Sequence, residues 1–366
     1  MVTTRLYTPG HNLVTDTLIM HGIVRYLLWA GVSKGVVRRI GDRFVIDIEE
    51  EISKDKERKA INQLITIQRA GVKTIEYDKP TTKFFEKIYR ANINEPVFWN
   101  WVRSIVDSIT KFDTILIYQD PDHKIKANEG RRRSRTGATV YLPLGPLYGK
   151  YEYADYNVKE GVQYTMCSSC FLMANLGLVY GSYVLRTQKG DKIYSIILNL
   201  IPSQEASIVD IALIQRAFEI QYKEERDIEV PILAVPLIAL SYGETLYGFE
   251  GMDAIVWINE RSGNFQRVPY FTTFNVDKVY KVISVIKIEV PDWPRIIEDY
   301  LLTEDGLHIL AYITETILGE GVKEHIYTLT RLLEAYVRAN KKDIPNISRG
   351  LGGKIIDIVD SLARSA

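Results

Sequence analysis

The hydrophobic pattern of this chain changes near residue 276, and this change limits the available folds more than any other feature. Before it, short β-branched runs flank tight turns, as at 36–40 and 43–48 around a Gly-Asp pair, and such runs predict β-hairpins. After it, apolar residues recur at helical spacing in four segments separated by short breaks. We therefore predict an α+β fold, with a large mixed domain at 1–275 that contains several hairpins. A helical domain resembling a four-helix bundle is expected at 276–366.

Caps, turns and apolar spacing predict the remaining elements. Thr15 and Asp16 are expected to cap a helix that runs to about Ala30, and Ser53 to cap a charged helix that Gly71 ends. Further helices are predicted to begin at Pro96 and to cover 167–178, 205–223, 291–302, 304–318, 321–340 and 348–363. Further strands are predicted at 5–7, 114–118 and 140–144, and two more hairpins at 182–201 and 254–271.

The overall composition is that of an ordinary globular protein. The 366 residues include 46 Lys and Arg against 46 Asp and Glu, so the formal net charge is zero, and 46% are hydrophobic. These values exclude a wholly disordered chain and a histone-like basic protein, but they leave room for local charged patches. The 44 Ile and 23 Tyr beside only 2 Cys favour a thermophilic protein.

The sequence carries no sign of a membrane or secretory protein. It has no run of 18 apolar residues, and its first residues lack a basic stretch followed by an apolar one. Two cysteines cannot build the disulfide framework of a small secreted domain. We therefore expect a cytoplasmic protein.

The common catalytic motifs are missing. The five histidines do not form His-Glu-x-x-His, and the P-loop, the Gly-x-Gly-x-x-Gly turn and the Gly-x-Ser-x-Gly elbow are all absent. Carboxylates are scattered, so no acid–base pair can be assigned from sequence. We therefore predict no catalytic residue, no metal ligand and no cofactor.

Cys167 and Cys170 form a Cys-x-x-Cys pair, a spacing found in metal and redox sites. Structural zinc usually needs four Cys or His ligands, and the chain has no second cysteine pair. A thioredoxin-like motif needs the pair between a strand and a helix, which the flanking sequence does not clearly show. Packing as small apolar side chains is the favoured interpretation. A local disulfide and a metal or redox role are the alternatives.

The segment 120–139 is almost free of apolar residues and is strongly basic, which is typical of a functional or a disordered loop. The window 121–150 holds seven Lys or Arg against two Asp or Glu, a net charge of +5. Guanidinium forks suit phosphate oxygens, and an amide can read a base edge. The predicted nucleic-acid-binding residues are Lys124, Lys126, Asn128, Arg131, Arg132, Arg133 and Arg135. The alternatives are a solvated loop or one that pairs with acidic surface such as residues 49–51.

Two weaker basic patches and a group of tyrosines accompany this segment. The first patch consists of Arg25, Lys34, Arg38, Arg39 and Arg43. The second consists of Arg331, Arg338, Lys341, Lys342, Arg349 and Lys354. Each could contact phosphates or be ordinary charged surface. Tyr148, Tyr151, Tyr153 and Tyr156 could stack on unpaired bases, although packing in a core or an interface is favoured.

Three features occur together in the order found in one protein family. The sequence Leu6-Tyr7-Thr8-Pro9-Gly10 precedes a helix that ends near Trp29, Cys167-Ser-Ser-Cys170 precedes the apolar run 171–177, and helical segments close the chain. In this order of parts the chain resembles the large subunit of the archaeal type I-A CRISPR interference complex, Cascade. Related large subunits often carry further cysteines for zinc, and this chain lacks them, so the resemblance implies no zinc here.

The resemblance implies a non-enzymatic role. Such a subunit would sit at the 5′ end of the guide RNA, recognise the protospacer-adjacent motif in target DNA and support strand separation. Its partners would be the backbone, small and tail subunits of Cascade, with a separate helicase-nuclease that cuts. Two other classes remain open from the residues: a nuclease-like enzyme with an unassigned site, and a purely structural assembly protein.

Overall fold

The computed structural model describes most of the N-terminal half and parts of the rest. The described residues are 4–75, 96–121, 126–127, 138–139, 164–189, 191–220, 231, 233–242, 251–262, 265–277, 304–318 and single positions between 279 and 338. The chain forms two compact units. Unit 1 contains 1–182 and 201–219, and unit 2 contains 183–200 and 220–366. The predicted domain boundary at residue 275 stays a prediction.

A four-stranded antiparallel sheet lies in unit 1, in the order β1-β3-β2-β9. Its strands are β1 (Thr4–Tyr7), β2 (Gly35–Ile40), β3 (Arg43–Ile48) and β9 (Glu205–Ser207). Gly41 turns the predicted hairpin between β2 and β3 with φ of +62°, a conformation that glycine adopts without strain. Leu6, Val37 and Ile46 occupy matching register positions and are fully buried, so they mark the core face of the sheet.

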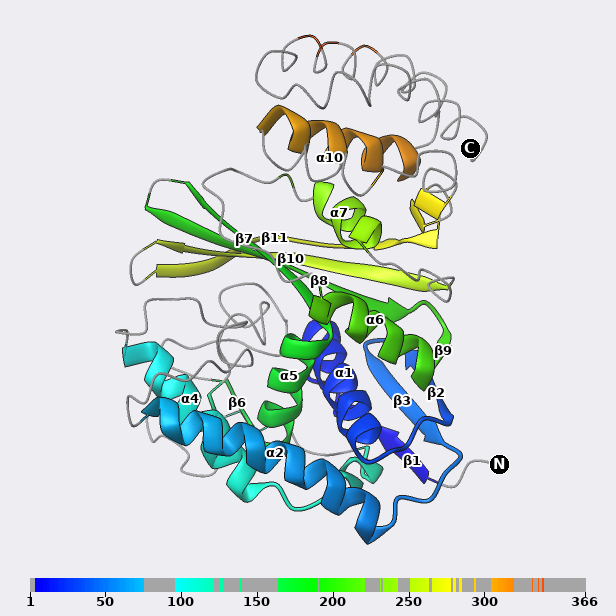
Figure 1. Cartoon of the computed structure of the whole chain (residues 1–366), viewed down its shortest axis with the longest axis vertical. Helices are drawn as coiled ribbons and strands as arrows, with labels where there is room; N and C mark the ends of the chain where they lie inside the picture. The colour runs from blue at the N-terminus through cyan, green and yellow to red at the C-terminus, as the bar shows by residue number, and fades with distance from the viewer. Residues whose placement is uncertain are drawn as a thin grey trace. The chain divides into compact units, whose positions relative to one another are not determined.

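Two apolar helices form the centre of unit 1. α1 (Leu13–Trp29) and α5 (Ser168–Tyr180) lie side by side (Figure 1). Most residues of both helices are buried. Gly22 lies against the main-chain carbonyl of Met173, and Gly177 against that of Leu18. A Cβ at either glycine would overlap the opposite backbone, so these two glycines permit the close approach of the helices.

The other elements of unit 1 surround this helix pair. They are α2 (Lys54–Ile75), α4 (Pro96–Lys111), the 3-10 helix η1 (Ile115–Gln119) and α6 (Ile208–Ile220). A small sheet in the order β4-β6-β5 is built from β4 (Lys126–Ala127), β6 (Tyr164–Met166) and β5 (Ala138–Thr139). α4 packs against both α2 and α5, and β6 leads directly through Cys167 into α5.

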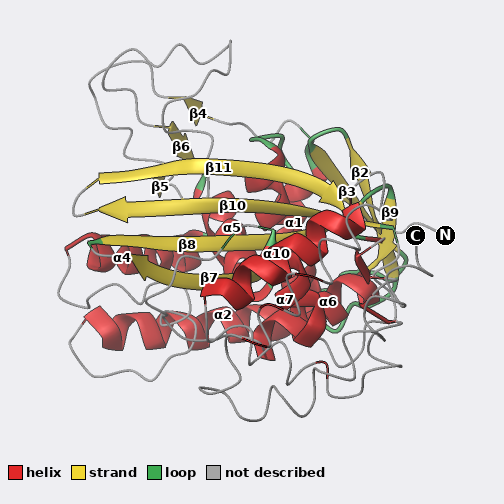
Figure 2. Cartoon of the chain, turned by 90° about the horizontal axis from the view of Figure 1, so that it is seen from above, coloured by secondary structure: helices red, strands yellow, loops and turns green. Residues whose placement is uncertain are grey.

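Unit 2 contains a second sheet in the order β11-β10-β8-β7 (Figure 2). Its strands are β7 (Ser182–Lys189), β8 (Lys192–Pro202), β10 (Met252–Ser262) and β11 (Phe265–Asn275). β10 and β11 pair antiparallel, and Trp257 on β10 is fully buried. Two helices of this unit, α7 (Ala234–Tyr242) and α10 (Glu304–Leu318), pack against each other.

Many of the predicted elements are confirmed. The three hairpins appear as β2–β3, β7–β8 and β10–β11, and the predicted helices at 167–178 and 304–318 appear as α5 and α10. The mixed α+β class is therefore confirmed. The predicted strand 140–144 and helices 291–302, 321–340 and 348–363 lie almost wholly outside the described residues. The four-helix bundle thus stays a prediction.

Several local predictions were wrong. The predicted strand at 114–118 is the 3-10 helix η1, because Thr114 accepts a hydrogen bond from Leu116 N at 3.2 Å and caps it. Ile115 and Tyr118, three residues apart, are its buried residues, as expected for three residues per turn. α2 continues past Gly71 to Ile75, and this glycine is buried, so packing overrides its helix-ending tendency.

Two further segments differ from the prediction around residues 205 and 235. In the predicted helix 205–223, the first three residues form β9 instead, because they pair with β2. The helix proper begins at Ile208. α7 was not predicted from the sequence.

Candidate nucleic-acid interface

The structure describes one of the seven predicted nucleic-acid-binding residues. Lys126 lies in β4, paired with Thr165 of β6, rather than in an irregular loop. The other six lie outside the described residues: Lys124, Asn128, Arg131, Arg132, Arg133 and Arg135. Their assignment to nucleic-acid binding therefore stays a prediction, and the structure bears on it through the residues at either end.

The part of the basic segment that contains its four arginines has both of its flanking strands, β4 and β5, paired with the same strand, β6. Thr165 pairs with Lys126 on one side and with Thr139 on the other, so β6 separates β4 from β5. Neighbouring strands of a sheet lie about 5 Å apart, so two strands on either side of a third are separated by roughly 10 Å. The chain between Ala127 and Ala138 thus leaves the small sheet and returns to it. This three-stranded sheet, the base of the basic segment, is continuous with the core helix α5.

The start of the basic segment, at Pro121, lies beside the loop that opens α1. Arg43 donates from Nη1 to the main-chain carbonyl of Pro121 at 3.4 Å. The same guanidinium lies against Gly10, which has φ of +83°, and a side chain there would overlap it. Arg43, a member of the first basic patch, therefore connects the start of the basic segment with the Thr8–Asn12 loop.

A buried carboxylate holds this loop in place. Asp16 is fully buried and accepts hydrogen bonds from Gly10 N at 2.7 Å, His11 N at 3.1 Å and Thr8 Oγ1 at 3.2 Å. Burial raises the pKa of Asp16 to about 7, while the hydrogen bonds and the nearby charge of Arg43 act in the opposite direction. Asp16 is thus a positioning residue for the loop.

The predicted caps of α1 need correction. Asn12 is the N-cap, and its Oδ1 accepts from Thr15 N at 2.9 Å. Asp16 lies in the first turn, one residue beyond Thr15, and faces back toward the loop. Asn, Asp and Thr are all good caps, so a run containing each of them does not identify the cap without the tertiary contacts.

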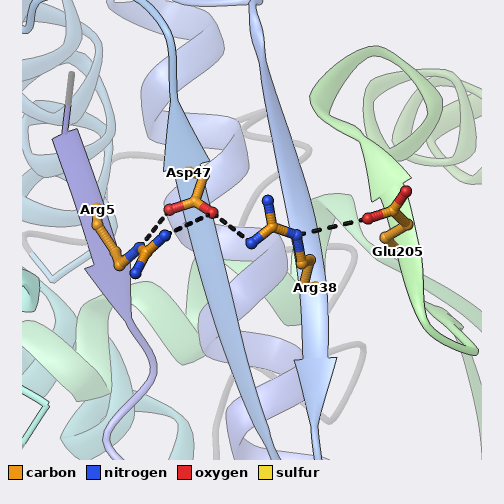
Figure 3. A network of polar contacts seen from close by, with 4 residues as sticks. All are labelled: Arg5, Arg38, Asp47 and Glu205. Atoms are coloured by element: carbon orange, nitrogen blue, oxygen red, sulfur yellow. Dashed lines mark hydrogen bonds and ion pairs between the residues drawn. The ribbon is translucent and has the colours of Figure 1, made fainter. Parts of the chain in front are cut away.

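Arg38 of the first basic patch belongs to an ion-pair network on the outer face of the unit 1 sheet (Figure 3). Its Nη1 lies 2.7 Å from Asp47 and its Nε 3.4 Å from Glu205. Arg5 donates to the other side of Asp47, at 2.5 and 3.2 Å. The Asp47 side chain is 3% exposed, whereas the two arginines are 47% and 42% exposed. The network joins four strands through Arg5, Asp47, Arg38 and Glu205.

Sequence reasoning missed the two carboxylates of this network. Asp47 interrupts the otherwise apolar strand 44–48, which was the available signal, since a buried charge needs a partner. Its partners are supplied by β1 and β2, whose pairing with β3 the sequence did not define in full. Glu205 comes from a strand more than 150 residues away in the sequence, and no local pattern points to it.

Two further arginines of the first basic patch are also engaged within the protein. Arg25 stacks on Tyr180, 4.0 Å from the ring centroid, and so joins α1 to α5. Arg39 donates from Nε to Gly41 O at 3.1 Å, whereas Lys34 makes its contact with Glu50 through its backbone N–H, at 3.0 Å. These contacts favour a structural role for the side chains of Arg25 and Arg39.

Glu50, part of the acidic surface considered as a partner for the basic segment, already has local partners. Lys56 lies 2.9 Å away, and the N–H groups of Ser33 and Lys34 donate to the same carboxylate. The Lys56 hydrogen bond and these two donors lower the pKa of Glu50 to about 2. The alternative of a basic segment paired with this carboxylate is therefore less favoured.

The second basic patch and the tyrosines are mostly outside the described residues. Arg331 and Arg338 occupy exposed helical positions. The structure does not describe Lys341, Lys342, Arg349, Lys354, Tyr148, Tyr151, Tyr153 and Tyr156. Their predicted roles stay predictions.

The two cysteines lie at the start of α5 and are not joined by a disulfide. Cys167 is the N-cap, and its Sγ accepts from Cys170 N at 3.3 Å. Cys170 is buried, and Tyr118 Oη donates to its Sγ at 3.7 Å. Burial raises the pKa of Cys170 and of Tyr118. The pair thus follows a strand and begins a helix, an arrangement that the sequence did not clearly show.

The described residues contain neither a membrane-spanning helix nor a cluster of metal ligands. No helix among them is long and apolar enough to cross a bilayer. No three His, Cys, Asp or Glu residues within this part of the chain come together as a metal site would require.

The amino-acid sequence matches a known protein family and two known proteins. A family model described as "CRISPR-associated protein (Cas_Csa4)" matches residues 4–352. A "CRISPR system associated protein Cas8" from Thermoproteus tenax is 29% identical over 307 residues, covering 80% of this chain and 83% of that protein. A "CRISPR-associated protein Cas8a2/Csa4" from Methanocaldococcus jannaschii is 25% identical over 214 residues, covering 56% of this chain and 53% of that protein.

Proposed function

Because the chain belongs to the Csa4 family of CRISPR-associated proteins, large subunits of type I-A Cascade, we propose that it contacts target DNA through its basic segment. In this role it recognises the protospacer-adjacent motif and supports separation of the strands. Guide RNA, the backbone, small and tail subunits and a helicase-nuclease are its partners. The subunit itself is non-catalytic, and cutting falls to the helicase-nuclease.

The attachment of the basic segment at both ends is the observation that carries this proposal. β4 and β5 flank β6, so the segment that contains Arg131, Arg132, Arg133 and Arg135 starts and ends on one small sheet. A segment attached at both ends loses less conformational entropy on binding than one attached at a single end. Four guanidinium groups in five positions can then neutralise several phosphates of one nucleic-acid backbone.

The zero net charge of the chain limits how it can bind DNA. Acidic residues elsewhere offset the +5 of the 121–150 window. Contact with the phosphate backbone should therefore be confined to a narrow strip, with sequence information supplied by guide pairing and by a short motif.

The test replaces Arg131, Arg132, Arg133 and Arg135 together by Ala in the assembled complex with its guide RNA. Because each phosphate contact releases counterions, we expect affinity for a matched duplex to fall about tenfold or more. The slope of log affinity against log salt should also decrease by about 2 to 4. A salt titration by electrophoretic mobility shift measures both quantities.

The matched control removes four exposed positive charges from α2: Lys54, Arg58, Lys59 and Arg69. This variant should bind DNA like the parent complex, although its net charge change is the same. If the two quadruple variants behave alike, or if the first leaves affinity and salt slope unchanged, the assignment of the basic segment is wrong. The subunit composition and guide RNA content of each complex verify that assembly is intact.

A further inference from the structure

The Cys167–Cys170 pair has the placement of a reactive dithiol. β6 ends at Met166, Cys167 caps α5, and Cys170 lies within the first turn of the helix. Cys167 Sγ accepts the hydrogen bond from Cys170 N at 3.3 Å, so its sulfur lies over the first turn of the helix. Cys167 is partly exposed, whereas Cys170 is 1% exposed. Solvent therefore reaches part of Cys167, whereas it does not reach Cys170.

The surroundings of the two sulfurs favour different steps of disulfide chemistry. The helix N-terminus and the amide that donates to Cys167 Sγ both stabilise negative charge, which favours a thiolate at that position. Cys170 is buried, which disfavours its thiolate and makes it a poor first nucleophile. Tyr118 Oη donates to Cys170 Sγ and would stabilise the charge that develops there as a disulfide closes.

We propose that Cys167 and Cys170 are a redox-active dithiol that low-molecular-weight disulfides oxidise to an intramolecular disulfide. The Cys167 thiolate attacks one sulfur of the small disulfide, which forms a mixed disulfide and expels one small thiolate. Cys170 then loses its proton to solvent, and its sulfur attacks Cys167 Sγ and expels the second small thiolate. Two electrons pass from the protein dithiol to the small disulfide, and no other reactant is needed.

This modification site lies at the base of the basic segment. Met166 of β6 pairs with Ala138 of β5, and Cys167 is the next residue. A disulfide would tie the end of that strand to the first turn of α5. The proposal does not depend on DNA binding, so its failure would leave the proposed function intact.

The experiment treats the reduced full-length chain with 5,5′-dithiobis(2-nitrobenzoate). Because the chain contains only 2 Cys, the products can be counted directly. We expect release of about two equivalents of nitrothiobenzoate and a chain without adduct that is lighter by about two hydrogens. Cys170→Ser should release one equivalent and keep a stable adduct on Cys167. Cys167→Ser should react at least about tenfold more slowly, because its remaining thiol is buried.

Other outcomes would overturn the proposal. These are stable adducts on both cysteines, a mixed disulfide on Cys167 that never closes, or Cys167→Ser reacting as fast as the parent chain. The Tyr118→Phe variant isolates the closing step, which should slow while the first attack is unchanged. If the disulfide closes at the same rate in Tyr118→Phe and in the parent chain, the Tyr118 hydroxyl has no part in the closing step. Circular dichroism of each reduced variant confirms that it is folded before it reacts.

Discussion

The two helices at the centre of unit 1, α1 and α5, begin in different ways although they share one buried contact. α1 is capped by Asn12, and the loop before it is held by Asp16 through three hydrogen bonds. α5 is capped by the sulfur of Cys167, which follows a strand directly, and its second thiol, Cys170, lies in the first turn of the helix.

The start of α1 has a structural role, whereas the start of α5 carries a reactive group. Amide and carboxylate oxygens are strong acceptors, so the start of α1 fixes a loop and, through Arg43, the stretch at Pro121. A thiol is a weak acceptor, so Cys167 gives its helix little stability as a cap. In exchange it places an oxidisable group beside the base of the basic segment. Three changes would test this contrast, beginning with the contact that both helices share.

The largest effect is expected at the shared contact. Gly177→Leu would place a side chain into the backbone of α1 at Leu18, and neither helix can move without disturbing the core. We expect a loss of about 3 kcal/mol or more in the free energy of unfolding, seen as a lower thermal midpoint or insoluble protein. The control Gln63→Leu adds the same side chain to an exposed position of α2 and should change stability by less than about 0.5 kcal/mol. Equal behaviour of the two variants would contradict the close helix contact.

The second effect concerns Asp16 and depends on pH. Since the folded-state pKa is raised to about 7, the stabilising contribution is complete below the unfolded value near 4 and is lost as pH rises through 7. Asp16→Asn removes this titration and replaces one acceptor oxygen by an amide group, at a cost of about 2 kcal/mol near pH 6. The stability gap between parent and variant should then narrow by about 1 kcal/mol between about pH 6 and pH 8. Urea denaturation at several pH values measures this gap, and a constant gap would contradict the raised pKa.

The smallest effect compares the two caps directly under reducing conditions. Asn12→Ala should destabilise α1 by about 1 kcal/mol, because Thr15 N loses its acceptor. Cys167→Ala should cost α5 less, since a sulfur accepts more weakly than an amide oxygen. Hydrogen exchange of peptides from the first turn of each helix measures both losses. A larger loss at Cys167 would mean that its sulfur is chiefly structural, against the contrast drawn above.

The local sequence pattern was sufficient to predict those helices and strands that their own residues and turns define. A Gly-Asp turn between β-branched runs predicted the β2–β3 hairpin, and the apolar run after Cys167 predicted α5. It failed at Thr114–Tyr118, because a short apolar run fits either a strand or a 3-10 turn, and only the Thr114 cap and burial of Ile115 and Tyr118 distinguish them.

Some features of the candidate site can likewise be predicted from the sequence, and others cannot. The concentration of arginine between residues 131 and 135 and the zero net charge of the whole chain are properties of the sequence alone. The attachment of both ends of that segment to β6, the engagement of Arg38 with Asp47 and Glu205, and the burial of Asp16 are decided by tertiary structure. The physical reason is that local charge and hydrophobic periodicity depend only on residues that are neighbours in the sequence. Strand pairing, by contrast, brings together residues far apart in the chain, and burial changes what a carboxylate, an arginine or a thiol can do.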